Sequence, residues 1–300
     1  MSALTYAAAN VLRLLPRASI GRAMGQLADI RWTPSLGRAV VGAYSRVYDV
    51  QLQEAAQSSG WPSFDAFFTR PLKDGARVID AAADAVVSPA DGRLESLGVI
   101  DARSAFVVKG RPYSVVELVG DAEEAKRYRG GLGCVVYLSP RDYHRVHSPV
   151  EGEIRTIRSL PGDYFPVNEM GVAHFPNLFA RNRRVAITID TPAAVGLGRV
   201  TVVMVAAMIV GRITVSGVEA RDVPMGVHTL RPARPVRRGE EIGMFHLGST
   251  AVVFFEERAR GVWAHGAAAQ IRYGERLLTT RVERSGSSTM PSTSEDGRGG

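Results

Sequence analysis

The sequence predicts an α+β protein with a mainly antiparallel β core and an N-terminal segment of amphipathic helices. Two observations carry this prediction. The first fifty residues repeat apolar side chains at helical spacing, and from Val86 onward short β-rich runs alternate with Gly and Pro. With 300 residues, 45% of them hydrophobic and 22% charged, the chain can bury a sizeable core and is globular, neither a fibre nor a disordered chain.

Two stretches near the N-terminus each carry an apolar face with arginines along its borders. The faces are formed by Ile20, Met24 and Leu27 and by Leu36, Val40, Tyr44 and Val47. Thr33-Pro34 marks the start of the second helix. The pattern is typical of helices lying in a membrane interface, where arginine stems bury and guanidinium groups reach phosphates. An ordinary helical bundle packed on the main domain has the same pattern, so both interpretations stay open.

The remaining chain divides into a β-rich domain, residues 61–284, and a tail, residues 285–300, after the helical segment of residues 1–60. The expected strands are Cys134–Leu138, Ile154–Leu160, Val185–Ile189, Thr201–Val215 and Ala251–Phe255. Glu117–Tyr128 is the clearest helical candidate within this domain. The tail is rich in Ser, Gly and Thr and has no apolar periodicity, so it is predicted to be disordered.

The net charge of +7 and the pI near 9.8 predict attraction to something anionic: nucleic acid, a membrane surface or an acidic substrate. The first 48 residues hold six arginines against the single acid Asp29, a net +5, which leaves +2 for the other 252 residues. The arginines are Arg13, Arg17, Arg22, Arg31, Arg38 and Arg46. This concentration favours an anionic membrane surface as partner and does not favour nucleic acid.

The apolar stretches are too short to span a bilayer. Neither residues 1–12 nor Val200–Gly211 approaches the roughly 18–20 residues that a spanning helix needs. The N-terminus lacks the order of a cleaved signal because its first basic residue, Arg13, follows the apolar run. Cys134 is the single cysteine, which excludes an intramolecular disulfide and fits a reducing, cytosolic setting.

One pattern occurs twice, sixty residues apart: S-P-x-acid-G-x-aliphatic at Ser88–Leu94 and at Ser148–Ile154. Proline fixes φ and the acid-Gly pair supplies a turn before a strand. The sequence therefore predicts two related turns that enter equivalent strands. A turn accounts for the prolines and glycines. It accounts less well for the carboxylates, since Asn or Ser at the acidic position would form the turn equally well.

Three polar clusters stand in apolar surroundings and could supply an acid, a base and a nucleophile. They are Asp91, the run from Asp142 through His144 to His147, and Gly248-Ser249-Thr250. No third ligand accompanies the two histidines, so no metal site is predicted. Gly248 leaves the peptide bond to Ser249 accessible to the serine's own hydroxyl. Because Ser249 leads into a strand, a nucleophile elbow is disfavoured, and a plain β-turn is the alternative.

These clusters lie within sequence motifs that occur in the same order in phosphatidylserine decarboxylase proenzymes, and the chain resembles that family from Phe67 to Thr250. The matching segments are Phe67–Leu72, Ser88–Gly92, Tyr137–His147, Pro176–Asn182 and Gly243–Thr250. The Leu-Gly-Ser-Thr form, residues 247–250, looks like the bacterial and mitochondrial branch.

The resemblance implies a precursor that cuts itself between Gly248 and Ser249 into a β chain, residues 1–248, and an α chain, residues 249–300, which remain together as a heterodimer. His147, oriented by Asp91, would take the proton from Ser249, whose hydroxyl attacks the Gly248 carbonyl. Ser249 would become a pyruvoyl group. No external cofactor and no metal are implied.

The pyruvoyl group would form a Schiff base with phosphatidylserine and act as the electron sink while CO₂ leaves, releasing phosphatidylethanolamine. The resemblance assigns His144 to decarboxylation as proton donor and Asp142 to a supporting role. It implies a peripheral enzyme on the cytoplasmic face of the cell membrane, with phosphatidylserine and the anionic surface as partners. A homo-oligomer is compatible with the sequence.

Two other functions stay open at the level of sequence. A pyruvoyl-dependent decarboxylase of a soluble amino-acid derivative would need the same Gly248–Ser249 cleavage but no interfacial helices. A catalytically silent membrane-binding protein with the same fold would keep Ser249 only as part of a turn.

Overall fold

The computed structural model describes residues 16–167, 169–208 and 212–280. Its core is an eight-stranded sheet in the order β11-β7-β8-β9-β13-β5-β2-β15, and every neighbouring pair is antiparallel. These strands are Gly226–Val236 (β11), Gly152–Leu160 (β7), Arg184–Asp190 (β8), Arg199–Ala206 (β9), Ser249–Phe255 (β13), Leu132–Leu138 (β5), Gly92–Val99 (β2) and Gln270–Ile271 (β15). The predicted α+β class with a mainly antiparallel core is confirmed.

Smaller sheets flank this core. One contains β1 (Ala85–Val87), β16 (Arg276–Thr280) and β14 (Gly261–Trp263), and another contains β10 (Arg212–Val215), β12 (Glu241–His246) and β6 (Arg145–His147). A hairpin is made by β3 (Ala105–Val108) and β4 (Arg111–Ser114). The short helices are η1 (Leu52–Glu54), α5 (Val115–Val119), α6 (Ala122–Lys126), α7 (Glu169–His174), α8 (Leu178–Arg181) and η2 (Ala193–Val195).

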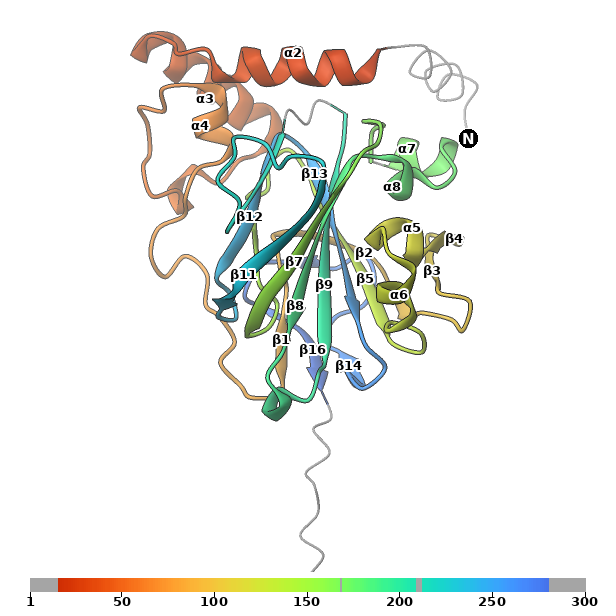
Figure 1. The fold of residues 1–300 in the computed structure, drawn as a ribbon. Coiled ribbons are helices and arrows are strands. Elements are labelled where there is room, and N and C mark those ends of the chain that lie inside the picture. The colour runs from red at the N-terminus through yellow and green to blue at the C-terminus, as the bar shows by residue number, and fades with distance from the viewer. Residues whose placement is uncertain (1–15, 168, 209–211, 281–300) are drawn as a thin grey trace, which may run out of the picture.

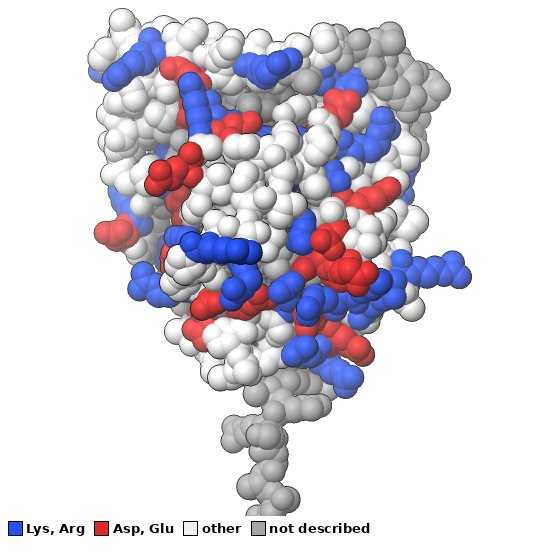
Figure 2. Space-filling view, in the orientation of Figure 1, with Lys and Arg blue, Asp and Glu red and all other residues white. Residues whose placement is uncertain are grey.

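Three helices lie together at one end of the sheets: α2 (Arg17–Asp29), α3 (Pro34–Tyr48) and α4 (Phe64–Phe68). Strands β1, β14 and β16 lie at the opposite end (Figure 1). Charged side chains of both signs are most numerous over the lower half of the face in Figure 2, away from these helices.

The helix expected to start at Thr33-Pro34 is confirmed. The Thr33 side chain accepts a hydrogen bond from the Leu36 backbone N–H at 3.4 Å, and Pro34 occupies the first helical position. Val41 is buried against the rest of the protein, whereas Leu36 and Val47 stay more than half exposed. The apolar surface of the helical segment is thus only partly covered by the β-rich domain.

Two expected elements are each divided in the structure. The run Thr201–Val215 is not one strand, because β9 ends at Ala206 and β10 begins at Arg212 in a different sheet. The expected helix Glu117–Tyr128 is broken at Gly120, whose φ of 75° ends α5, and Asp121 caps the start of α6. The predicted tail, residues 285–300, lies outside the described residues.

No helix among the described ranges is long and apolar enough to cross a membrane.

The central strand of the large sheet is β13, which pairs with β9 on one side and β5 on the other, and all seven of its residues are buried. Phe254 lies edge-on to Phe106, with ring centroids 5.9 Å apart. This position explains why the run Ala251–Phe255 is continuously apolar.

The repeated S-P-x-acid-G segments form two equivalent turns, as predicted. The Ser88 hydroxyl donates to the Ala90 carbonyl at 2.8 Å and the Ser148 hydroxyl to the Val150 carbonyl at 2.6 Å. The turns also exchange backbone hydrogen bonds: His147 N–H donates to Pro89 O at 2.7 Å, and Val87 N–H donates to Pro149 O at 3.0 Å. The two halves of the repeat therefore lie side by side.

A second repeated segment, R-x-G-E, supports each turn. The Gly239 backbone N–H donates to the Ser148 carbonyl at 2.8 Å, and the Gly274 backbone N–H donates to the Ser88 carbonyl at 3.1 Å. Both glycines have positive φ, 77° and 85°, in the region that favours glycine. This half of the repeat, residues 237–240 and 272–275, could not be predicted from the sequence, because four residues with one variable position are too short a signal.

Replacing the buried Phe254 tests the central position of β13. Phe254→Ala removes a fully buried ring from the core and is expected to lower the free energy of unfolding by about 3–5 kcal/mol. Urea denaturation followed by tryptophan fluorescence measures this change. The matched control is Val262→Ala on the surface of β14, for which a change within about 0.5 kcal/mol is expected. Similar losses for both variants would contradict the buried, central position of Phe254.

Candidate active site

Ser249 is the first residue of β13, with Leu138 and Ala206 as its partners in the two neighbouring strands. The residue is buried, and its hydroxyl oxygen has no hydrogen-bond partner among the described residues. At the preceding Gly248, an added Cβ would meet no atom within 4 Å. A free hydroxyl therefore adjoins a peptide bond that has open space beside it.

Leu247, one residue earlier, has a φ of 85°. A residue other than glycine in this region costs about 1–3 kcal/mol, so the surrounding structure must hold it there. Its buried side chain packs in a cluster with Ala28 of α2 and Phe68 of α4. Sequence reasoning missed this feature, because no local pattern indicates a left-handed leucine.

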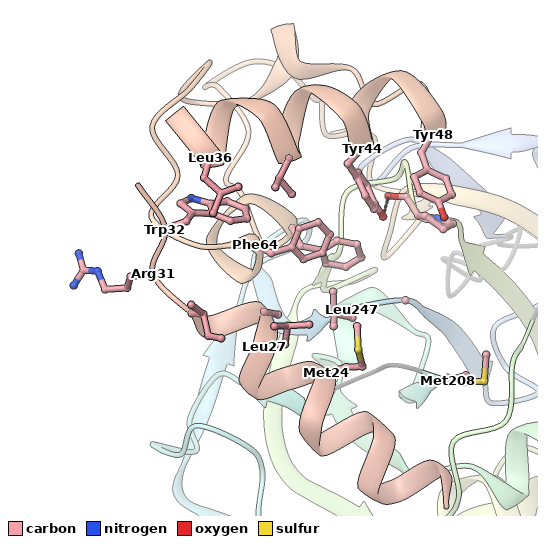
Figure 3. Close-up of a pocket in the computed structure, with 16 residues that line it drawn as sticks. Met24, Leu27, Arg31, Trp32, Leu36, Tyr44, Tyr48, Phe64, Met208 and Leu247 are labelled. Atoms are coloured by element: carbon pink, nitrogen blue, oxygen red, sulfur yellow. Dashed lines mark hydrogen bonds between the residues drawn. The ribbon is translucent and has the colours of Figure 1, made fainter. Parts of the chain in front are cut away.

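An apolar cavity of about 570 Å³ reaches the Gly248 position from the N-terminal helices. Its lining comprises Met24, Leu27, Ala28, Ile30, Arg31, Trp32, Leu36, Val40, Tyr44, Tyr48, Phe64, Phe68, Pro140, Met208, Leu247 and Gly248. Figure 3 shows Met24 and Leu27 from α2 lying across the cavity from Tyr44, while the Arg31 side chain points away. The Tyr44 hydroxyl donates to Pro140 O at 3.0 Å and ties α3 to the loop before His144.

His144 is fully buried, and the centroid of its ring lies 4.0 Å from the centroid of the Phe68 ring. Its Nδ1 lies 2.8 Å from the Asp142 carbonyl oxygen, which only accepts, so Nδ1 carries the proton. Nε2 is then a free lone pair without a partner among the described residues. Burial lowers the pKa of His144 to about 3, so the ring is neutral at pH 7.

His147 has the same tautomer. Its Nδ1 donates to the Gly239 carbonyl at 2.8 Å, and Nε2 accepts from the Tyr143 hydroxyl at 3.3 Å. The ring stacks on Tyr273, with centroids 3.7 Å apart and planes 5° from parallel. Burial lowers the pKa of His147 to about 4, which leaves a neutral imidazole with its lone pair on Nε2.

Asp91 is held by two groups that sequence reasoning did not identify. Arg77 Nε donates to both carboxylate oxygens at 3.2 Å, and the Tyr273 backbone N–H donates to Oδ1 at 2.9 Å. Within the described part of the chain no hydrogen bond joins Asp91 directly to His147. Tyr273 connects them, because its backbone binds Asp91 and its ring stacks on His147.

Asp142 shapes the loop that carries His144. Its Oδ2 accepts hydrogen bonds from both the backbone N–H and the hydroxyl of Ser139 at 2.7 Å. Burial raises the pKa of the Asp142 carboxyl group. Asp91 and Asp142 both border a polar cavity of about 380 Å³, which shares no lining residue with the apolar cavity.

The two histidines lie at different distances along β12 from the Gly248–Ser249 bond. His147 pairs with Glu241, whereas the His144 carbonyl accepts a 3.0 Å hydrogen bond from Phe245 N–H. Phe245 and Glu241 are four strand residues apart, or about 13 Å. The structure therefore places the backbone of His144 closer to the predicted cleavage point than that of His147.

Together these residues offer a buried hydroxyl, two neutral imidazoles with their lone pairs on Nε2 and two carboxylates, the kinds of group that covalent and acid–base catalysis require. Among residues 16–167, 169–208 and 212–280, no group of three or more His, Cys, Asp or Glu side chains could hold a metal ion. The fold and the site define a β-rich enzyme with a buried serine hydroxyl, unpartnered among the described residues, at the start of a strand.

Comparison with known proteins gives the family. Residues 64–279 match the family model described as phosphatidylserine decarboxylase. The chain is 37% identical over 274 residues to the phosphatidylserine decarboxylase proenzyme of Myxococcus xanthus, covering 89% of this chain and 96% of the relative. The proenzyme of Acinetobacter baumannii is 38% identical over 271 residues, with 88% and 93% covered. That of Hahella chejuensis is 39% identical over 274 residues, with 88% and 90% covered.

The chain therefore belongs to the phosphatidylserine decarboxylase family, which consists of pyruvoyl-dependent carboxy-lyases. The resemblance identified in the sequence is confirmed.

The buried neutral histidines predict a loss of stability in mild acid. The unfolded chain binds protons at the ordinary histidine pKa of 6.5, whereas folded His144 and His147 do so only near pH 3 and pH 4. Since the unfolded state binds more protons between these values, the free energy of unfolding should fall as the pH drops below 6.5, by about 2 kcal/mol for each histidine at pH 5. Urea denaturation at pH 7, 6 and 5 measures this slope.

His147→Gln should reduce the slope by about half, because one of the two protonation sites is removed. Val262→Ala on the surface of β14 is the control and should keep the wild-type slope, because it removes no titratable group. An unchanged slope in His147→Gln would contradict the neutral, buried state of this ring.

Proposed function

We propose that this chain is a proenzyme that cuts itself between Gly248 and Ser249 and then decarboxylates phosphatidylserine to phosphatidylethanolamine. One observation carries the proposal: the Ser249 hydroxyl is buried and without a partner in the described structure, beside an open Gly248 peptide that lines an apolar cavity. The relatives named above are phosphatidylserine decarboxylase proenzymes, which supports the same activity here.

In the proposed cleavage His147 Nε2 takes the proton of the Ser249 hydroxyl, and the oxygen attacks the Gly248 carbonyl carbon. The peptide C–N bond breaks, leaving an ester between Gly248 and the serine oxygen and a free amine on Ser249. Loss of the Ser249 Cα proton then expels the Gly248 carboxylate and leaves dehydroalanine. Water replaces its nitrogen, which departs as ammonia, so Ser249 becomes a pyruvoyl group.

The assignment of His147 and Asp91 to cleavage follows the family resemblance. The tautomer of His147 supports it, because Nδ1 is committed to Gly239 and the lone pair lies on Nε2. Asp91 would act through Tyr273, which binds its carboxylate and stacks on the imidazole. The backbone register along β12 makes His144 the competing base.

The surroundings of Ser249 fit a pyruvoyl group, because the adjoining position is open to a substrate approaching through the apolar cavity. That group would supply a conjugated carbonyl that accepts the electron pair of the C–CO₂ bond when CO₂ leaves. The aliphatic and aromatic lining would hold acyl chains next to it. His144 Nε2 is its free nitrogen for proton transfer, since Nδ1 is bonded to the Asp142 carbonyl.

The helical segment is the proposed membrane-docking surface. Leu27, Ile30 and Leu36 line the cavity and are each more than half exposed, so apolar surface continues from the cavity to the outside. Arg31 and Arg38 lie on the same segment and suit anionic headgroups. The enzyme would therefore sit peripherally on the cytoplasmic face of the membrane while the acyl chains remain in lipid.

Denaturing electrophoresis and intact mass test the cleavage. Wild type should give fragments of residues 1–248 and 249–300, the smaller one with a blocked N-terminus. Ser249→Ala should remain one chain because the nucleophile is gone. Asp91→Ala and His147→Ala should also remain uncut, whereas His144→Ala should be cut yet convert no labelled phosphatidylserine.

Three outcomes would each contradict a part of this scheme. A single intact wild-type chain rejects self-cleavage altogether. An uncut His144→Ala together with a cut His147→Ala would assign the base to His144, as the backbone register along β12 favours. Conversion of labelled phosphoserine but not of phosphatidylserine by wild type would instead identify a decarboxylase of soluble substrates.

Sedimentation with liposomes tests the docking surface. Leu27→Glu places a charge on the proposed surface and should reduce binding to vesicles containing phosphatidylglycerol about tenfold, since charged groups are costly at the acyl boundary. Val262→Glu is the matched control, because Val262 and Leu27 are each 58% exposed and Val262 belongs to β14, which lies at the opposite end from α2 (Figure 1). Equal binding by the two variants would reject the assigned surface.

A further inference from the structure

We propose that Asp65 and His246 are positioning residues for self-cleavage, which together with Leu247 clamp the chain on the N-terminal side of the Gly248–Ser249 bond. The inference rests on the proposed cleavage and adds the structural element that prepares the bond for it.

His246 is the last residue of β12, two residues before Gly248. Its ring is buried between two partners: Nδ1 donates to Asp65 Oδ1 at 2.7 Å, and Nε2 lies 3.3 Å from the Thr214 hydroxyl. Both ring nitrogens are therefore engaged. The ring cannot turn without breaking these hydrogen bonds, so the end of β12 is fixed.

The other oxygen of Asp65 extends this contact into the helical segment. Asp65 Oδ2 accepts from Arg212 Nη2 at 2.7 Å, and Arg212 also binds both carboxylate oxygens of Asp29 at 2.7 Å. Asp29 ends α2, Asp65 lies in α4 and Arg212 begins β10. The chain before the cleavage point is thus tied through Asp65 to two N-terminal helices and a neighbouring strand.

Ser249 fixes the chain on the other side, because it pairs with Leu138 and Ala206 in the middle of the large sheet. Only Leu247 and Gly248 connect the two fixed ends. Leu247 takes the unfavourable φ of 85°, and its side chain is held among Ala28 and Phe68. The direction of the Gly248 carbonyl is therefore determined before the serine attacks, and the constraint disappears once the bond is cut.

The first test measures the rate of self-cleavage after pulse-labelled cell-free synthesis, with electrophoresis at successive times. His246→Phe keeps a ring but cannot donate to Asp65, and Asp65→Ala removes the acceptor. Each should cut about tenfold more slowly, a change that corresponds to about 1.4 kcal/mol in the barrier. His246→Asn carries a side-chain N–H₂ near the Nδ1 position and should restore most of the rate.

Decarboxylation per cut chain distinguishes a positioning role in cleavage from a general structural role. After cleavage is complete, decarboxylation per cut chain should equal wild type in His246→Phe. Wild-type cleavage rates in both variants, or an equal loss of cleavage and decarboxylation, would overturn the inference. A wild type that is never cut would reject the proposed function itself, so the two failures are distinguishable.

The second test isolates the backbone of Leu247. Leu247→Ala and Leu247→Gly both lose the packing on Ala28 and Phe68, but only glycine adopts a positive φ without strain. If the constrained backbone prepares the bond, the glycine variant should be cut about tenfold more slowly than the alanine variant. Equal rates in these two variants would remove the backbone of Leu247 from the clamp.

Discussion

The hydrogen bonds exchanged between two repeated turns are the constraint on which the site depends. His147 N–H donates to Pro89 O and Val87 N–H donates to Pro149 O, so two segments sixty residues apart in sequence are joined side by side. Asp91 follows one junction and His147 belongs to the other. Because the backbone makes these contacts, the two side chains are brought to the same region whatever the neighbouring surface residues are.

A second constraint acts on the nucleophile. Ser249 begins the central strand of the large sheet, where strands on both sides fix its backbone. The chain before it is fixed by the hydrogen bond between His246 and Asp65. The peptide bond between Gly248 and Ser249 therefore spans two rigid parts of the fold, and Leu247 accommodates the connection with a positive φ.

Burial sets the chemistry of the histidines. Both rings are enclosed by aromatic neighbours, Phe68 for His144 and Tyr273 for His147, and both donate Nδ1–H to a backbone carbonyl. Desolvation disfavours the charged imidazolium, so both rings are neutral at pH 7. Nε2 of His144 has no partner among the described residues, whereas Nε2 of His147 accepts from the Tyr143 hydroxyl. The N-terminal helices contribute to this enclosure through Phe68 and at the same time line the apolar cavity.

Much of this arrangement could be predicted from local patterns. The helix beginning at Pro34, the buried strand Ala251–Phe255 and the two S-P-x-acid-G turns all depend on residues close together in the chain, and the structure confirms them. The division of Thr201–Val215 between two sheets was not predicted, because apolar composition does not reveal which sheet each half joins.

The sequence by itself determined the class of fold, the family and the identity of the polar residues, because these follow from periodicity, turn chemistry and ordered motifs. Only the tertiary structure decided that Arg77 and Tyr273 hold Asp91, that Asp65 reaches His246, and that Leu247 is left-handed. Tyr273 and Asp91 are 182 residues apart, and His246 and Asp65 are 181 apart. Contacts over such separations arise from the packing of whole sheets and helices, and no short segment of sequence encodes them.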